Sequence, residues 1–362
     1  MNDTIARLEE RLAEYVGRRY CLSTGSGTMA LTVALKALGL PRRSEVIIPS
    51  ICCRAVPFAV IYAGLTPVFC DVNMYDYNIS LESIADAVSN KTRVIIPVHS
   101  FGYPSPMDEL LKYAKDRSIV VLEDAAQAFG GSSRGRKLGS FGDLSITSFG
   151  YAKIIDVGGG GAVFTDNCHL AKAMKDINGR MLKHRDMSSR FARKMYLRME
   201  KWKSRNVNPS RMILNLERSL HRLISFTEMK RHWGECILKA MDSIDDVTLM
   251  RKKKAELYRR LIKSESILHP RYESEEGTCF RYSVLLRHER RKAVQDELNK
   301  RGVWVSTLYP ALHRLYRHSG DPGERRRPNS EYIESHIINL LVDPSTGEEK
   351  IRQIAEVINE VA

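Results

Sequence analysis

A chain of 362 residues with 43% hydrophobic and 28% charged residues can bury a large core and usually forms two domains. No apolar run is long enough to span a bilayer, and the charged N-terminus lacks a signal-peptide pattern. Seven cysteines without CxxC pairs predict reduced thiols in a cytoplasmic protein. The net charge of +14 could attract an anionic partner. No zinc-finger or nucleic-acid-binding motif accompanies it, so neither a metal nor nucleic acid is expected.

The first half of the chain predicts alternating helices and strands. An amphipathic helix near residues 5–16 is followed by apolar, β-branched runs that predict strands at 20–22, 45–49, 66–72, 92–98 and 118–124. Helical patterns lie between them, at 28–38, 55–63, 81–88 and 106–115. Such alternation favours a mostly parallel sheet with helices on both faces.

The middle of the chain is a basic segment without strand patterns. Apolar residues at helical spacing predict helices at 191–203 and 212–224, and the first of them is rich in Arg and Lys. An amphipathic stripe is more often core or dimer packing, and the alternative is peripheral contact of residues 186–225 with an anionic membrane. The C-terminal part predicts helices at 240–262, 289–302 and 347–361 and strands at 280–287 and 303–308.

Three short segments follow predicted strands, which is where parallel sheets bind their ligands. "STGSGTMAL" (23–31) could offer backbone N–H groups and hydroxyls to an anion at a helix start, although a plain helix cap is about as plausible. "LEDAAQAFGG" (122–131) places Asp124 at a strand end. "SITSFGYAKIIDVGGGG" (145–161) places Lys153 between an apolar strand and four glycines.

Together, these three segments meet the requirements of pyridoxal 5'-phosphate. Its phosphate needs a helix start with hydroxyl groups, and its pyridine nitrogen needs an anionic partner to stay protonated. Its aldehyde needs an amine that can lose its proton near neutral pH. The sequence therefore predicts pyridoxal phosphate as the cofactor, with Lys153 and Asp124 as the catalytic residues.

With these motifs, the sequence resembles a divergent member of the DegT/StrS-type sugar aminotransferases. The resemblance covers most of the chain except about 183–226 and is carried by "SGTMAL", "EVIIPS", "VLEDAAQAFGG" and "RGVWVSTLYPALH", among others. It implies a fold-type-I α/β architecture. A large domain (1–235) would hold a mostly parallel sheet with helices on both faces, and a smaller α+β domain (236–362) would follow.

The resemblance also implies an activity. The chain would be a cytoplasmic, homodimeric aminotransferase with active sites at the subunit interface. It would convert a keto sugar, expected to be nucleotide-linked, to an amino sugar in polysaccharide or secondary-metabolite biosynthesis, with glutamate as donor. Two alternatives stay open: a relative with altered chemistry or substrate, and a non-catalytic relative that needs a partner chain.

Positions that match the family imply individual roles. Lys153 would bind the cofactor's aldehyde covalently, Asp124 would pair with the pyridine nitrogen, and Gln127 would lie near the phenolic oxygen. His99 is expected to be a satisfied structural histidine, and tight turns are expected at Gly139 and Gly142. The phosphate would be bound at Ser26, Gly27, Thr28 and Ser148.

The sequence departs from the family at several of its usual positions. Cys53 stands where an aromatic residue usually stacks on the pyridine ring; its sulfur could pack there or be an ordinary buried thiol. Gly150 replaces a usual histidine, and Gly159 replaces the glutamate of a "GEGG" run. "FTEM" (226–229) lacks the asparagine that reaches the partner's cofactor phosphate in the family. The chain also starts at a helix that normally follows an N-terminal segment near the substrate.

Overall fold

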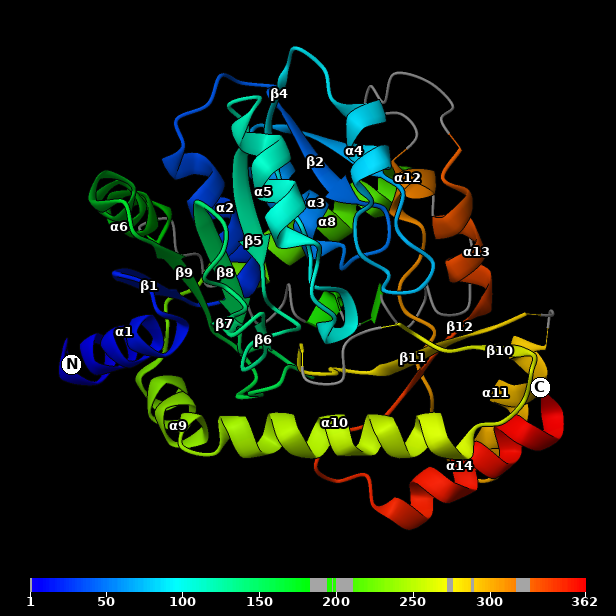
Figure 1. Cartoon of the computed structure of the whole chain (residues 1–362). Helices are drawn as coiled ribbons and strands as arrows, with labels where there is room; N and C mark the ends of the chain where they lie inside the picture. Colours follow the sequence, from blue (N-terminus) through cyan, green and yellow to red (C-terminus); the bar gives the residue numbers. More distant parts are fainter. Residues whose placement is uncertain are drawn as a thin grey trace.

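The computed structural model of the chain describes residues 2–182, 194–196, 198–199, 211–271, 276–287, 290–316 and 326–362. These residues form a larger unit around a seven-stranded sheet and a smaller unit around a three-stranded sheet (Figure 1). The predicted α/β architecture is confirmed. In the described ranges, no helix has both the length and the apolar character needed to cross a bilayer. All seven cysteines are free thiols.

The large sheet has the strand order β1-β9-β8-β5-β4-β2-β3. From β8 to β3 neighbouring strands run parallel, whereas β9 and β1 are antiparallel at one edge. The strands are β1 (Tyr20–Thr24), β2 (Glu45–Pro49), β3 (Thr66–Cys70), β4 (Thr92–Ile95), β5 (Val120–Asp124), β8 (Leu144–Ser148) and β9 (Gly161–Thr165). Strand β5 begins later than predicted because Ser118 has a φ of 54°, outside the range of an extended strand.

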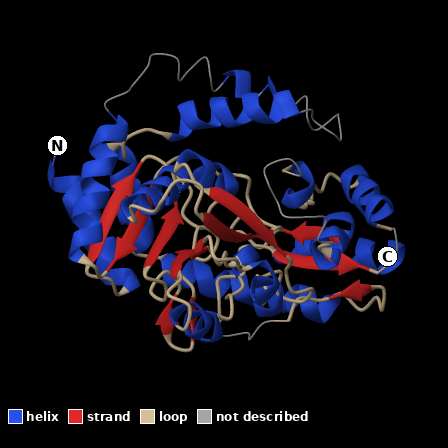
Figure 2. Cartoon of the chain, turned by 90° about the horizontal axis from the view of Figure 1, so that it is seen from above, coloured by secondary structure: helices blue, strands red, loops and turns tan. Residues whose placement is uncertain are grey.

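Helices cover both faces of this sheet, as the sequence predicts (Figure 2). Because side chains alternate along a strand, Val46 and Ile48 of β2 join one core and Ile47 joins the other. The first core lies under α2 (Gly27–Ala37), α3 (Ala55–Tyr62) and α6 (Cys168–Leu182). The second lies under α4 (Leu81–Ala87) and α5 (Met107–Lys115), which stand in front of the sheet in Figure 1.

A third core lies at the β1 edge and leads into the smaller unit. It joins α1 (Asn2–Val16), α9 (Arg231–Met241) and β9 through buried side chains that include Leu8, Ile237 and Phe164. The next helix, α10 (Ile244–Leu261), begins in this core and ends in that of the smaller unit (Figure 1). The division of the chain at 235/236 stays a prediction.

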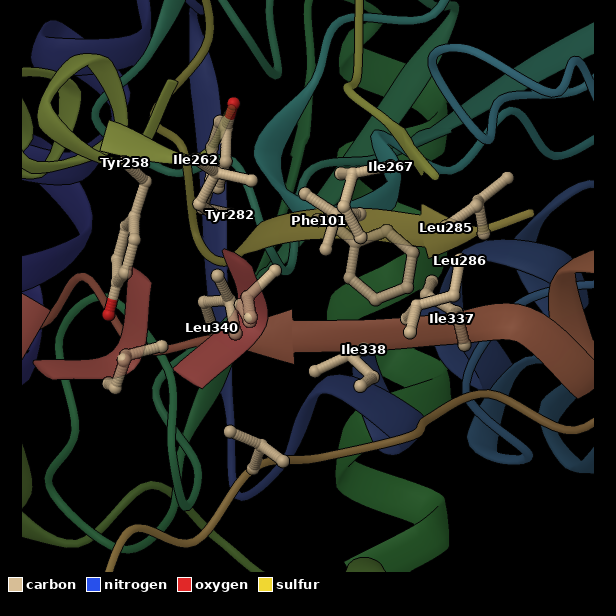
Figure 3. Close-up of a cluster of buried hydrophobic side chains, with 14 of the residues drawn as sticks. Phe101, Tyr258, Ile262, Ile267, Tyr282, Leu285, Leu286, Ile337, Ile338 and Leu340 are labelled. Carbon is tan, nitrogen blue, oxygen red and sulfur yellow. The ribbon is translucent and has the colours of Figure 1, made fainter. Parts of the chain in front are cut away.

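The smaller unit contains an antiparallel sheet of order β10-β11-β12. Its strands are β10 (Ile267–Leu268), β11 (Tyr282–Leu286) and β12 (Ile337–Leu340), and α10, α11 (Arg291–Lys300) and α14 (Glu348–Val361) accompany them. Figure 3 shows its core, in which Tyr258 and Tyr282 stack with ring centroids 5.6 Å apart. Phe101, from the short helix η1 (Ser100–Gly102) of the larger unit, lies in the same core.

The strand predicted for 303–308 is wrong. Of this segment only Ser306 pairs, in an isolated bridge with Asn339 of β12. Val303 and Val305 are buried while Trp304 is 64% exposed, so the alternating pattern reflects an irregular segment that lies along the core. The remaining short elements are β6 (Ser132–Ser133), β7 (Arg136–Lys137), α12 (Leu312–Leu315) and α13 (Pro328–His336).

The basic segment is described in part. The helix predicted for 191–203 lies outside the described residues except for 194–196 and 198–199, which are helical. The second predicted helix is confirmed as α8 (Arg211–Ser225), which lies behind the sheet near α3 in Figure 1. Its apolar stripe is only partly covered, because Leu220 is buried whereas Leu216 and Leu223 are 47% and 44% exposed.

Candidate active site

A cavity of about 600 Å³ lies beyond the ends of β5 and β8, at the start of α2. It brings together residues that are far apart in the sequence, as expected at the carboxyl ends of parallel strands. All but one of the predicted site residues line it: Ser26, Gly27, Thr28, Cys53, Asp124, Ser148 and Lys153.

Asp124 places a buried carboxylate against the cavity. Its side chain is 4% exposed, and its Oδ1 accepts a hydrogen bond from the Ala126 N–H at 2.9 Å. Burial raises the pKa of Asp124, while that N–H and the charge of Lys153 act in the opposite direction. A cation at this point of the cavity would therefore stabilise the carboxylate.

Lys153 presents its amine to the same cavity. The turn that follows β8 is held by the Lys153 N–H, which donates to the Gly150 carbonyl at 3.2 Å. The side chain is half-buried, and Nζ lies 5.8 Å from the ring centroid of Phe280, which precedes β11. The amine thus lies near a residue of the smaller unit, and its charge acts on the Asp124 carboxylate.

The start of α2 forms an anion cradle at the cavity wall. The Ser26 hydroxyl accepts from the Met29 N–H at 3.1 Å and donates to the Ser225 carbonyl at 2.7 Å, so this side chain caps the helix and contacts α8. A Cβ on Gly27 would lie 2.8 Å from the Ser148 Cβ, a spacing that only glycine allows. The first N–H groups of a helix have no partner within it and attract anions. They therefore suit a phosphate.

Gln127 is the one predicted site residue that does not line the cavity. Its side chain is buried, and its Oε1 accepts from the Phe101 N–H at 3.0 Å. Its carbonyl accepts from the Thr278 hydroxyl at 3.1 Å. The observed contacts thus join the larger unit to the smaller one, and a contact with the cofactor's phenolic oxygen stays a prediction.

Behind Asp124, His99 and Glu123 form a buried hydrogen-bonded pair. The Ser105 N–H donates to His99 Nδ1 at 2.9 Å, so Nε2 carries the proton and donates to Glu123 Oε1 at 2.9 Å. Burial would raise the pKa of Glu123, but His99 and backbone N–H groups of the 139–142 turn hold it below its usual range. His99 is therefore the structural histidine that the sequence predicts.

Several cavity residues come from α8, α9 and the turn between them, where the sequence analysis placed no site. They are His221, Ser225, Thr227, Lys230 and Trp233. The turn before α2 contacts this segment directly, because the Gly25 N–H donates to the Thr227 carbonyl at 2.9 Å. A Cβ on Gly25 would lie 2.1 Å from that oxygen. The sequence analysis did not predict this close approach to Gly25.

Two glycines of the run after Lys153 also lie too close to other residues to carry a side chain. A Cβ on Gly159 would lie 2.3 Å from Cη2 of the Trp233 indole, and one on Gly161 would lie 2.6 Å from the Ser26 carbonyl carbon. The indole thus occupies the space that a glutamate at position 159 would need. This departure from the family's usual residue is linked to the presence of Trp233.

An amine, a buried carboxylate and a helix start around one cavity, on a mostly parallel sheet with a smaller α+β unit, define a fold-type-I pyridoxal phosphate enzyme. Residues 1–359 match the sequence model of the DegT/DnrJ/EryC1/StrS aminotransferase family. The chain belongs to this family, and it is a pyridoxal phosphate-dependent aminotransferase.

Similar proteins cover nearly the whole chain. The GDP-perosamine synthase of Escherichia coli O157:H7 is 28% identical over 359 residues, which are 98% of this chain and 89% of that protein. The dTDP-3-amino-3,6-dideoxy-alpha-D-galactopyranose transaminase of Aneurinibacillus thermoaerophilus is 25% identical, over 97% of this chain and 88% of that protein. The solved structure of Helicobacter pylori PseC, an aminotransferase, shares the fold with a TM-score of 0.82 at 20% identity, covering 100% of this chain and 91% of that one.

Proposed function

We propose that this aminotransferase moves an amino group from glutamate to a keto sugar linked to a nucleotide, in the cytoplasm. The proposal rests on the cavity that holds Lys153, Asp124 and the start of α2 together. The names of the two relatives above each contain a nucleotide-linked sugar, which supports this substrate class. The free thiols support a reducing compartment.

Pyridoxal phosphate fits the residues present, because the buried Asp124 carboxylate faces the cavity with a pKa that burial has raised. A protonated pyridine nitrogen would supply the missing cation. Gly27 and Thr28 at the start of α2, with the Ser148 hydroxyl, would bind the phosphate. When bound, the cofactor carries the amino group between donor and acceptor and withdraws electrons from the carbon that loses its proton.

Lys153 supplies the base in this proposal. Its Nζ would hold the cofactor's aldehyde and, when free, would accept the proton from the carbon that bears the amino group. Asp124 keeps its charge throughout and so holds the pyridine proton. The half-buried position of Lys153 excludes part of the water that would compete for the proton.

The glutamate half-reaction tests this function. Purified protein loaded with pyridoxal phosphate is mixed with L-glutamate alone, and 2-oxoglutarate is measured by mass spectrometry. We expect about one equivalent per chain, and a loss in rate on the order of a thousandfold in Lys153→Ala. D-glutamate is the matched control. Formation of 2-oxoglutarate by Lys153→Ala at the wild-type rate would overturn the role of the lysine, and none from L-glutamate with the wild type would favour altered chemistry or a different donor.

We also propose a homodimer that completes the site. Tyr151 lines the cavity yet is 88% exposed, which is unusual for a large aromatic side chain at an active site. A second copy of the chain would cover it. Light scattering that gives the mass of one 41.2 kDa chain at assay concentration would contradict this proposal.

Membrane contact through residues 186–225 stays a prediction, because half of them lie outside the described ranges. The exposed Leu216 and Leu223 of α8 support it, and equally support a dimer contact. The absence of binding to anionic liposomes in a flotation assay at low salt would rule it out.

A further inference from the structure

The cavity contains few positive charges for a site that takes phosphate groups. Among the described residues that line it, Lys153 and Lys230 are the only lysines or arginines. The proposed function, on which this inference rests, assigns Lys153 to the cofactor's aldehyde. Lys230 is then the one lining ammonium, within the described part of the chain, left to neutralise a phosphate dianion.

The backbone before Lys230 lies against the anion cradle. The Thr227 carbonyl accepts the Gly25 N–H at 2.9 Å, directly before the start of α2. Two residues further on, the Met229 Cε lies 3.0 Å from where a Cβ of Gly160 would be. The Gly160 N–H in turn donates to the Gly25 carbonyl at 2.8 Å. Lys230 thus follows a segment that is in contact with the cradle at two points.

Trp233 orients the Lys230 side chain. The Lys230 Nζ lies 4.5 Å from the centroid of the Trp233 ring, a cation–π contact. The indole is itself packed on the backbone of Gly159, and all three residues line the cavity. Within the described ranges, Lys230 makes no ion pair with a carboxylate. Its charge is therefore available to a ligand.

The start of α9 adds to this positive region. Lys230 is the N-cap residue of α9, and no side chain caps this helix start by a hydrogen bond. The first N–H groups of the helix therefore lack side-chain partners, and they form the positive end of an 11-residue helix. The cavity wall thus combines two helix starts, those of α2 and α9, with one oriented ammonium group.

We propose that Lys230, oriented by Trp233 at the start of α9, binds a phosphate group in the cavity from the same chain. Two ligands of this enzyme class carry that chemistry: the cofactor, through its 5'-phosphate, and a nucleotide-linked substrate, through its diphosphate. The contact of residue 227 with the start of α2 favours the cofactor.

The first arm of the test compares pyridoxal phosphate with pyridoxal, which lacks the phosphate. Both are titrated into cofactor-free protein, and because Trp233 lines the cavity, quenching of tryptophan fluorescence reports binding. We expect Lys230→Ala to bind pyridoxal phosphate about tenfold more weakly and pyridoxal unchanged. Lys230→Arg should keep most of the affinity. Lys239→Ala, which removes an exposed lysine from the last turn of the same helix, is the matched control.

The second arm uses the cofactor-loaded protein and titrates GDP, UDP and dTDP against the corresponding nucleosides. A loss for the diphosphates alone would assign Lys230 to the substrate's phosphates instead. If Lys230→Ala behaves like Lys239→Ala in both arms, the proposal is overturned. If the wild type binds neither pyridoxal phosphate nor pyridoxal, the proposed function fails, which is a different result. Thermal unfolding confirms that each variant is folded, and Lys230→Gln replaces Lys230→Ala if that variant is not.

Discussion

The buried Asp124 carboxylate lowers the free energy of unfolding of the cofactor-free protein at neutral pH. Burial raises its pKa above the ordinary value of 3.8. Between that value and the raised one, the folded protein keeps a proton that the unfolded chain has lost. The free energy of unfolding therefore falls as pH rises through this interval, and the deficit persists at neutral pH.

Asp124→Asn removes this cost. In the cofactor-free protein, the variant should have a higher melting temperature than the wild type at neutral pH, and the difference should shrink on acidification toward pH 3.8. The same variant should bind pyridoxal phosphate over 100-fold more weakly, because removing one partner of a buried ion pair costs about 3 kcal/mol. Differential scanning calorimetry across the pH range checks the first expectation. A melting-temperature difference that does not depend on pH would contradict it.

At the scale of elements, α8 is fixed to the start of α3 by an ion pair. Arg54 Nη1 lies 3.2 Å from Glu217 Oε1, and the Glu217 side chain is fully buried. His221, one turn further along α8, lies against Phe58 of α3 with ring centroids 5.2 Å apart. Because Arg54 follows Cys53, this pair positions α8 beside the cavity.

Glu217→Gln should loosen α8 from the larger unit. Breaking the buried pair should cost about 2 kcal/mol, a value reduced because the Arg54 side chain is 26% exposed. Amide hydrogen exchange in residues 215–225 should then be roughly thirtyfold faster. Glu235→Gln is the matched control, since its pair with Arg231 is exposed on both sides and contributes little. Equal protection of α8 in the two variants would show that the Arg54 pair does not hold it.

The sequence predicts the elements of the larger unit because local periodicity decides them. Strands of four or five apolar residues and amphipathic helices between them need no knowledge of distant contacts. Segment 303–308 misleads because Val303 and Val305 alternate with Trp304 in an irregular segment whose inner side chains are buried. Alternation reports burial on one side, and not hydrogen bonding to a neighbouring strand.

The candidate site was predictable only where it follows strand ends. Lys153, Asp124 and the start of α2 are placed by the topology of the parallel sheet, so their meeting can be deduced. Lys230 and Trp233 reach the cavity because Thr227, just before α9, contacts the turn at Gly25 while α9 packs on α1. No local pattern encodes that path. At Gly159 the Trp233 indole packs so closely on the backbone that a side chain would not fit, and the sequence alone does not identify that indole.

At the scale of the whole molecule, the larger unit contributes side chains to the core of the smaller unit. Phe101 of the larger unit is buried with Tyr282 and Leu340 of the smaller unit (Figure 3). Gln127 and Gly102 form hydrogen bonds with Thr278, which precedes β11. The units are thus joined by contacts directly behind Asp124, and any movement between them changes the surroundings of the site.

We propose that Lys153, among the described lysines, is the amine that binds the aldehyde of pyridoxal phosphate. Borohydride reduction of protein incubated with pyridoxal phosphate, followed by peptide mapping, measures where the cofactor becomes fixed. We expect the phosphopyridoxyl mass on the peptide that contains Lys153, in about one copy per chain, and its loss in Lys153→Ala. Label spread over surface lysines, or retained at the same level in Lys153→Ala, would show that Lys153 does not bind the cofactor's aldehyde.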